Sequence, residues 1–92
     1  MTAKGRHIFM AKFVKLSEII VHHSGDKETR SIMVNPESVK EIRPYKIKHS
    51  TDGEHNALDC TRLTYNFPNS RGETFVYVEE AAEAVAQAFL LS

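Results

Sequence analysis

The chain has 92 residues, of which 41% are hydrophobic and 26% are charged, and its formal net charge is zero. This length predicts one domain with a limited core, and the composition excludes a disordered or fibrous protein. Residues 1–48 carry ten Lys or Arg and five Asp or Glu, and residues 49–92 carry two and seven, a division that disfavours nucleic-acid binding.

The first third of the chain predicts a mobile arm followed by a hairpin. Residues 1–11 carry small and basic groups without periodicity, so we expect a flexible arm ahead of a single domain over residues 12–92. From Lys12 to His22, β-branched and aromatic residues predict a strand, and the alternation slips at Ser17 in a way typical of a bulge. A turn rich in Ser, Gly and Asp then leads to an antiparallel strand from Thr29 to Val34.

Pro36 is the clearest sign in the sequence that a strand ends and the chain changes direction. A proline disfavours the helical conformation for the preceding residue and suits the first position of a turn. Val39 and Ile42 follow at the spacing of a helical face, so we expect a single helical turn or a tight corner from Glu37 to Arg43, with both apolar side chains under the sheet edge. Pro44 is expected to end this turn.

Two further strands are predicted in the second half. Tyr45, Ile47 and His49 alternate with lysines and predict a third strand with a basic outer face. The polar segment 50–56 reads as a loop. Residues 59–67 alternate most regularly of all, which predicts a strand from Asp59 to Phe67.

The C-terminal segment predicts a short strand and a helix. After the turn at residues 68–72, a strand is expected from Glu73 to Val78 and a helix from Glu79 to Leu90, because alanine and glutamate favour helices. Its predicted buried stripe consists of Val78, Ala82, Val85 and Phe89. The predicted fold is therefore α+β, an antiparallel sheet of four to five strands with one C-terminal helix.

Five segments together carry a family resemblance. They are Phe13-Val14-Lys15-Leu16, Ile32-Met33-Val34-Asn35, the Val39 and Ile42 pair, Thr61-Arg62-Leu63-Thr64, and Val76-Tyr77-Val78-Glu79-Glu80 ahead of a helix containing Val85. Over about Phe13 to Phe89 the chain resembles the small FlbD-like proteins of flagellar operons and their phage and uncharacterised bacterial relatives. The resemblance implies a non-enzymatic accessory factor.

The predicted third strand is the candidate interaction surface. Arg43, Tyr45, Lys46 and Lys48 form its basic part, and Arg62 and Tyr65 could extend it on the neighbouring strand. Cations interleaved with aromatic rings are also the arrangement that stacks single-stranded bases, so a nucleic-acid-binding module is an alternative. A solvated polar face is the simpler interpretation, because we expect Tyr65 to point into the core.

The histidines and Cys60 provide the only candidates for metal binding or catalysis. His22 and His23 are adjacent, so on a strand they face opposite sides and cannot share a metal. His49, Asp52, His55, Asp59 and Cys60 lie within twelve residues and have side chains that suit zinc. A polar loop with incidental histidines is the alternative. No metal is therefore predicted, and His49, His55 and Cys60 remain weak candidates.

Cys60 with His49 or His55 could also form a nucleophile and base pair, against the alternative of a half-buried strand cysteine. The sequence contains no phosphate-binding loop and no nucleophile elbow. We therefore predict no enzyme activity and no cofactor.

The remaining predictions concern location and partners. A single cysteine cannot form an internal disulfide, and Lys12 and Lys15 interrupt the apolar residues near the N-terminus, so no signal peptide is predicted. No apolar run approaches the roughly eighteen residues that span a bilayer. We therefore expect a cytoplasmic, non-catalytic module that contacts another protein or a second copy of itself, and the segment from Pro44 to Cys60 is the expected working surface.

Overall fold

Alternating apolar and polar residues place five segments in one antiparallel sheet, and the alanine-rich segment that follows them forms a helix. The computed structural model describes residues 13–51 and 54–92, so the arm predicted over residues 1–11 lies outside the described residues. In chain order the elements are β1 (Val14–Val21), β2 (Lys27–Val34), the 3-10 turn η1 (Pro36–Ser38), β3 (Val39–Thr51), β4 (Glu54–Tyr65), β5 (Phe75–Val78) and α2 (Ala82–Leu91). This arrangement confirms the predicted α+β fold.

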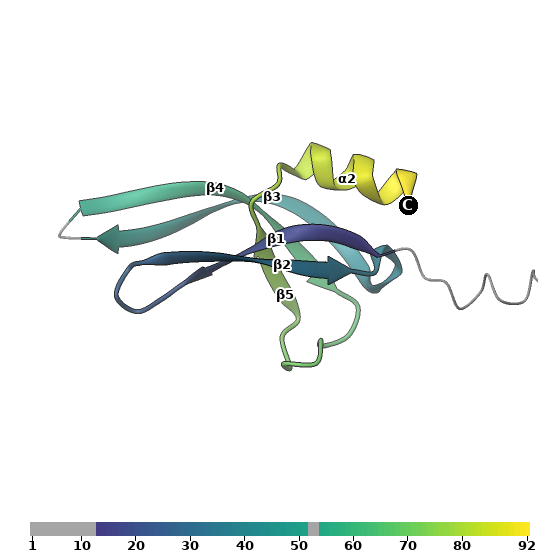
Figure 1. Cartoon of the computed structure of the whole chain (residues 1–92), viewed down its shortest axis with the longest axis horizontal. Helices are drawn as coiled ribbons and strands as arrows, with labels where there is room; N and C mark the ends of the chain where they lie inside the picture. The colour runs from purple at the N-terminus through teal and green to yellow at the C-terminus, as the bar shows by residue number, and fades with distance from the viewer. Residues whose placement is uncertain (1–12, 52–53) are drawn as a thin grey trace, which may run out of the picture.

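Strand β5 joins two hairpins into one sheet. The order is β2-β1-β5-β4-β3, and every neighbouring pair is antiparallel. β5 pairs with β1 only at Glu18↔Val78 but with β4 from Thr61↔Val78 to Thr64↔Phe75. Figure 1 shows the two hairpins spreading on either side of β5, with α2 along one side of the sheet. Within the described residues, the other side carries no helix.

The bulge predicted in the first strand is wrong. β1 and β2 pair without a register shift from Val14↔Val34 to Val21↔Lys27. The hydrophobic alternation slips because a charged residue, Glu18, occupies a buried position next to Leu16, while Ile19 is buried on the opposite face. A strand that is covered on both faces does not show a clean period of two.

The short helical turn predicted after Pro36 is confirmed, but it does not extend to Arg43 as expected. The turn η1 ends at Ser38, after the Asn35 side-chain oxygen accepts the Glu37 amide at 3.0 Å, and β3 begins at Val39. A register shift between Val39 and Glu41 inserts one extra residue into the strand. The bulge therefore turns Val39 and Ile42 to the same, core-facing side, so their spacing only resembles that of a helix.

Pro44 continues a strand instead of ending a turn. It lies opposite Thr61 in β3, the edge strand of the sheet, where a residue without an amide hydrogen is tolerated. β3 runs on to Thr51 and β4 begins at Glu54, so most of the segment predicted as a loop over residues 50–56 belongs to a long hairpin. Residues 52–53 lie outside the described part of the chain.

Helix α2 covers the core from one side. The buried cluster consists of Leu16, Val34, Leu63, Val76, Val78 and Val85. Val85 comes from the helix and Phe89 packs against the same cluster, as the predicted stripe requires, and Val78 belongs to the cluster from the end of β5. The Glu80 carboxylate, just ahead of α2, accepts the Ser17 amide at 3.0 and 3.1 Å. In the described part of the chain, no helix has the length and apolar character needed to cross a membrane.

Candidate interaction face

The side of the sheet opposite α2 carries a cluster of aromatic rings around one arginine. Arg62 of β4 pairs with Tyr77 of β5. Phe75 lies two residues before Tyr77 in β5 and therefore points to the same face, and Tyr45 belongs to β3. The Tyr45 and Tyr77 ring centroids are 5.0 Å apart, and those of Phe75 and Tyr77 are 5.7 Å apart. We call the surface formed by Tyr45, Arg62, Phe75 and Tyr77 the open face.

Arg62 holds this cluster together electrostatically. Its guanidinium carbon lies 5.3 Å from the Tyr45 ring centroid and 5.4 Å from that of Phe75, distances at which the negative face of a ring attracts a cation. Its Nε is buried and has no hydrogen-bond partner among the described residues. Burial raises the pKa of the Tyr77 hydroxyl and Tyr45 adds to the rise, whereas Arg62 lowers it. The rings therefore contribute to holding this cation in place.

Three of the four residues predicted as an interaction surface lie beside the open face. Tyr45, Lys46 and Lys48 line an open pocket of about 520 Å³ together with Tyr77 and residues of β1. Arg43 does not line it, and its guanidinium is bound to the Glu41 carboxylate at 2.6 Å. Lys46 is also paired, with Asp59 at 3.4 Å. The basic charge that the sequence predicted along this strand is thus partly neutralised.

Phe75 and Tyr77 are members of the open face that the sequence analysis did not select. They alternate with the buried Val76 and Val78. Because successive side chains of a strand point to opposite faces, this alternation could have placed them on the outer side of β5. Their contact with Arg62 depends on the pairing of β4 with β5, which local patterns do not encode. Tyr65, by contrast, packs against the core as expected.

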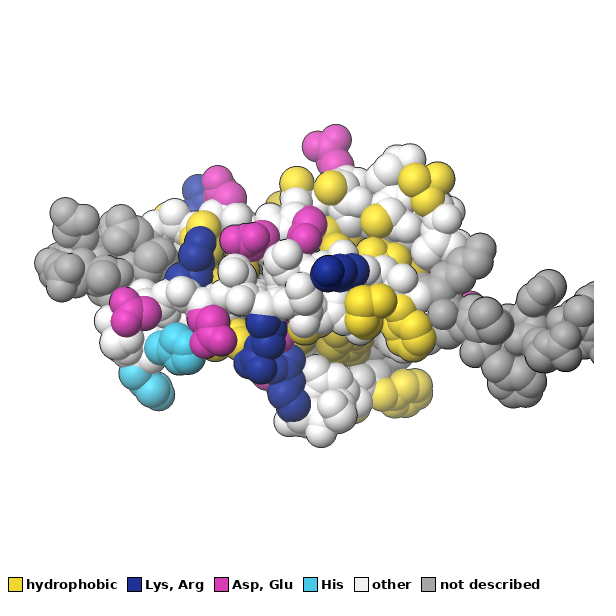
Figure 2. Space-filling view, in the orientation of Figure 1, with side chains coloured by type: hydrophobic (Ala, Val, Ile, Leu, Met, Phe, Trp, Pro, Cys, Tyr) yellow, Lys and Arg dark blue, Asp and Glu magenta, His cyan; other side chains and the backbone are white. Residues whose placement is uncertain are grey.

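A second apolar surface lies at the end of the sheet where β1 begins and β2 ends. Phe13, Met33 and Phe67, which we call the terminal patch, are 53%, 61% and 81% exposed. They line an open pocket of about 520 Å³. In Figure 2, hydrophobic side chains gather toward this end of the molecule, on the right of the view.

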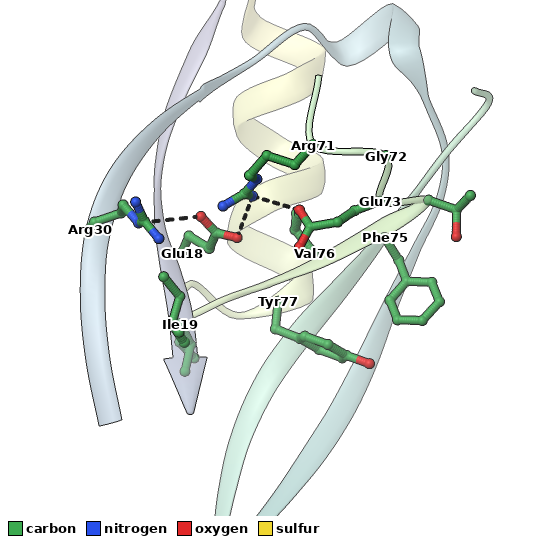
Figure 3. Close-up of a pocket in the computed structure, with 11 residues that line it drawn as sticks. Glu18, Ile19, Arg30, Arg71, Gly72, Glu73, Phe75, Val76 and Tyr77 are labelled. Carbon is green, nitrogen blue, oxygen red and sulfur yellow. Dashed lines mark hydrogen bonds and ion pairs between the residues drawn. The ribbon is translucent and has the colours of Figure 1, made fainter. Parts of the chain in front are cut away.

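A network of charged side chains occupies the gap between β1 and β5. Glu18 is almost completely buried, and its Oε2 accepts a hydrogen bond from Arg71 Nη2 at 2.8 Å. The same Arg71 nitrogen lies 2.8 Å from the Glu73 carboxylate, and Arg30 Nε lies 3.9 Å from the other Glu18 oxygen (Figure 3). The hydrogen bond to Glu18 raises the pKa of Arg71, so this guanidinium is fully charged.

The backbone register separates Cys60 from the two histidines of the weak metal candidate. His49 lies opposite Asn56 and His55 opposite Ser50, whereas Cys60 lies opposite Tyr45. Four or five residues of strand correspond to about 13–16 Å, while zinc ligands lie about 2.0–2.3 Å from the ion. The side chains of His49 and His55 lie outside the described part of the structure. Among the described residues, no group of three or more His, Cys, Asp or Glu side chains is placed to hold a metal ion.

The other histidine candidates occupy the turn of the first hairpin. His22 Nε2 lies 2.9 Å from the Glu28 carboxylate, and both side chains are about half exposed. His23 is exposed. Asp52, which completed the predicted zinc set, lies outside the described residues.

Cys60 is expected to react slowly with iodoacetamide at neutral pH. Its side chain is buried, and burial together with the neighbouring Asp59 raises the pKa of the thiol above its usual 9.0. Because the thiolate is the nucleophile, alkylation of the folded protein should be at least about tenfold slower than that of free cysteine. The rate should rise about tenfold for each pH unit and should still be rising at pH 9.0, and unfolding in urea should remove the difference. Mass spectrometry of the alkylated chain over time measures both rates, and labelling of the folded chain as fast as free cysteine would restore Cys60 as a candidate nucleophile.

Comparison with known proteins identifies no relative: no family model, no curated protein and no solved structure matches this chain.

Proposed function

We propose that this chain is a non-catalytic protein-interaction module and that the open face is its contact surface. The observation that carries the proposal is the position of Tyr45, Phe75 and Tyr77 around Arg62 on the side of the sheet away from α2. Tyr45 and Phe75 remain 39% and 42% exposed. Tyrosine and arginine dominate the binding energy of protein interfaces, and rings held in place lose little entropy on binding.

The sheet also has edges at which a second chain could bind. β2 and β3 are the edge strands, so one side of each has no strand partner within the described residues. Exposed edges of this kind pair readily with another chain. A domain of this size gains stability from a partner subunit, because its own core is small. We therefore propose a bacterial accessory protein that binds a protein partner or a second copy of itself, and a relationship to the FlbD-like proteins stays part of this prediction.

Binding of single-stranded nucleic acid is the second candidate, because Arg62 and the lysines of β3 lie near aromatic rings. Two of the predicted cations, Arg43 and Lys46, are however paired with acidic side chains. A nucleic-acid surface needs unpaired positive charge to release counterions from the phosphates. Contact with a protein is therefore the proposal that the charges favour.

The proposal is tested by removing the rings of the open face. In the Tyr45→Ser/Phe75→Ser double variant, self-association measured by light scattering, or retention of a partner from a lysate, should fall at least about tenfold. Phe67→Ser is the matched control, because it removes a more exposed ring from the terminal patch. This control should bind like the unaltered protein, and a far-UV circular dichroism spectrum confirms that each variant is folded.

Three results would contradict the proposal. The unaltered chain could remain a strict monomer at high concentration and retain no partner. The double variant could bind as well as the unaltered chain, or Phe67→Ser could reduce binding equally, which would move the surface to the terminal patch. Salt-dependent binding of a short single-stranded oligonucleotide, lost in the double variant, would favour the second candidate instead.

A further inference from the structure

The two hairpins separate beyond their one pair, and the resulting gap is lined by polar groups. β1 and β5 are in register only at Glu18↔Val78. Next to this pair lies an open pocket of about 540 Å³, to which β1 contributes Glu18, Ile19 and Ile20, β2 contributes Arg30 and the segment 71–77 contributes the remaining wall. Figure 3 shows the Glu18 carboxylate between the guanidinium groups of Arg30 and Arg71.

One oxygen of the buried Glu18 carboxylate is not hydrogen-bonded. The side chain is 6% exposed, and its Oε2 is bound by Arg71 at 2.8 Å. Oε1 has no hydrogen-bond partner among the described residues. Arg30 Nε lies 3.9 Å from it, beyond the distance of a hydrogen bond. A buried acceptor without a donor costs free energy, so a donor that reached Oε1 would be bound favourably.

The charge of the pocket favours a cation as that donor. Arg71 is shared between two carboxylates, those of Glu18 and Glu73, each 2.8 Å away. These three groups carry an excess of one negative charge. Arg30, which also lines the pocket and lies 3.9 Å from Glu18 Oε1, brings the sum to zero. Its side chain is 53% exposed and forms no hydrogen bond with Glu18, so an entering cation that donates one to Oε1 can replace it.

The aromatic residues of the same pocket decide which cation fits. Phe75 and Tyr77 line it, and both belong to the open face. A guanidinium can stack on a ring while it donates hydrogen bonds in its plane, whereas an ammonium is a compact, strongly hydrated charge. The chain itself shows the two halves of this recognition at separate arginines, since Arg62 lies over Phe75 and Arg71 binds Glu18.

We propose that this pocket is a subsite for the guanidinium group of an arginine on the partner protein, with Glu18 Oε1 as its acceptor. The proposal rests on the proposed function, because the subsite adjoins the open face. Arg30 acts as a gate: it lies over the free oxygen and moves aside when the partner's arginine binds. The open face then supplies apolar contact area, and the subsite selects a partner with a basic side chain at the rim of the interface.

The test uses N-acetyl-arginine amide, with N-acetyl-citrulline amide as its uncharged counterpart. Amide chemical shifts of the ¹⁵N-labelled chain should move saturably around Gly72, Thr74 and Val76 with the arginine compound and not with citrulline. Glu18→Gln should weaken this binding at least about tenfold, since hydrogen bonds to a charged acceptor are the stronger ones. Arg30→Ala should strengthen it at least about threefold, because it removes the competing cation.

Lys27→Ala is the matched control, since Lys27 is another cation of β2 that does not line the pocket. Its affinity for the arginine compound should equal that of the unaltered chain. Equal shifts with citrulline, unchanged binding in Glu18→Gln, unchanged binding in Arg30→Ala, or no binding at all would each overturn the subsite. If Glu18→Gln fails to fold, the citrulline comparison and the Arg30→Ala variant still decide whether the subsite binds a guanidinium group.

The test of the arginine subsite can succeed or fail independently of the test of the proposed function. Association that is lost in Tyr45→Ser/Phe75→Ser, together with no binding of the arginine compound, would retain the interaction module and remove the subsite. Binding of the arginine compound by a chain that shows no association and retains no partner would leave a guanidinium site but contradict the proposed function.

Discussion

Replacing Leu63 by alanine is expected to lower the free energy of unfolding by about 2–5 kcal/mol, because the substitution leaves a cavity that the sheet cannot close. Leu63 is 0% exposed and lies in β4, between Ile42 of β3 and Val76 of β5. It belongs to the cluster that also contains Val85 of α2. Domains of this kind are stable by about 5–15 kcal/mol, so the loss is a large share of the total.

The matched control is Leu90→Ala, the same chemical change at a position that is 80% exposed. Its expected effect is below about 0.5 kcal/mol, as for surface substitutions in general. Urea unfolding followed by circular dichroism and tyrosine fluorescence measures both variants, since the chain contains no tryptophan. Equal losses in the two variants would show that the core is not centred on Leu63.

The strands were predictable from sequence where one face is apolar. Residues 59–65 alternate because Thr61 and Leu63 point to the core while Arg62 and Thr64 do not, and this segment forms part of β4. The helix was predictable from composition, and Val85 and Phe89 pack as the periodicity requires. In both cases the pattern reflects burial mainly on one side of the element, which local spacing records directly, although Cys60 is buried on the other side of β4.

The predictions failed where the placement of a residue depends on contacts with distant parts of the chain. Val39 and Ile42 are three residues apart, which is typical of a helix. They share a face of β3 because a bulge adds one residue between them, and bulges leave no fixed sequence signal. Pro44 indicated the end of an element, because proline is rare inside strands. It is accepted here because β3 is an edge strand, and the sequence alone does not show which strands lie at the edges. The dipeptide Asp52-Gly53 is a common hairpin-turn sequence, and it could have indicated that the third and fourth strands extend further.

The candidate surface was predictable only in part, for a similar reason. Tyr45, Lys46 and Lys48 lie in one strand, so a local pattern of basic and aromatic residues selects them. Arg62 meets Tyr45 and Phe75 through pairings with two different strands. Glu18 and Arg71 are 53 positions apart in sequence, and neither residue alone signals a buried charge network. Contacts of this range require the sheet order, which the strand patterns do not determine.

Replacing Val85 by aspartate is expected to undock α2 and to lower the free energy of unfolding by at least about 3 kcal/mol, because a charge without a partner cannot stay buried in the apolar cluster. Val85 is the buried residue of α2, and it is 0% exposed. The helix has only ten residues, and isolated helices of that length are marginal in water. The undocked segment should therefore lose its helical signal at 222 nm as well as its contacts.

Ala84→Asp separates this effect from the helix propensity of aspartate. Ala84 is the exposed neighbour of Val85 in the same helix. Alanine is a better helix former than valine, so the intrinsic cost of Ala84→Asp is the larger of the two, and it is still below about 1 kcal/mol. Urea unfolding should show a loss in Val85→Asp that exceeds the loss in Ala84→Asp by about 2 kcal/mol or more. Similar losses in the two variants would mean that α2 contributes little to the core. In that event the side of the sheet that α2 covers would be as accessible to a partner as the open face, and the assignment of the contact surface would have to change.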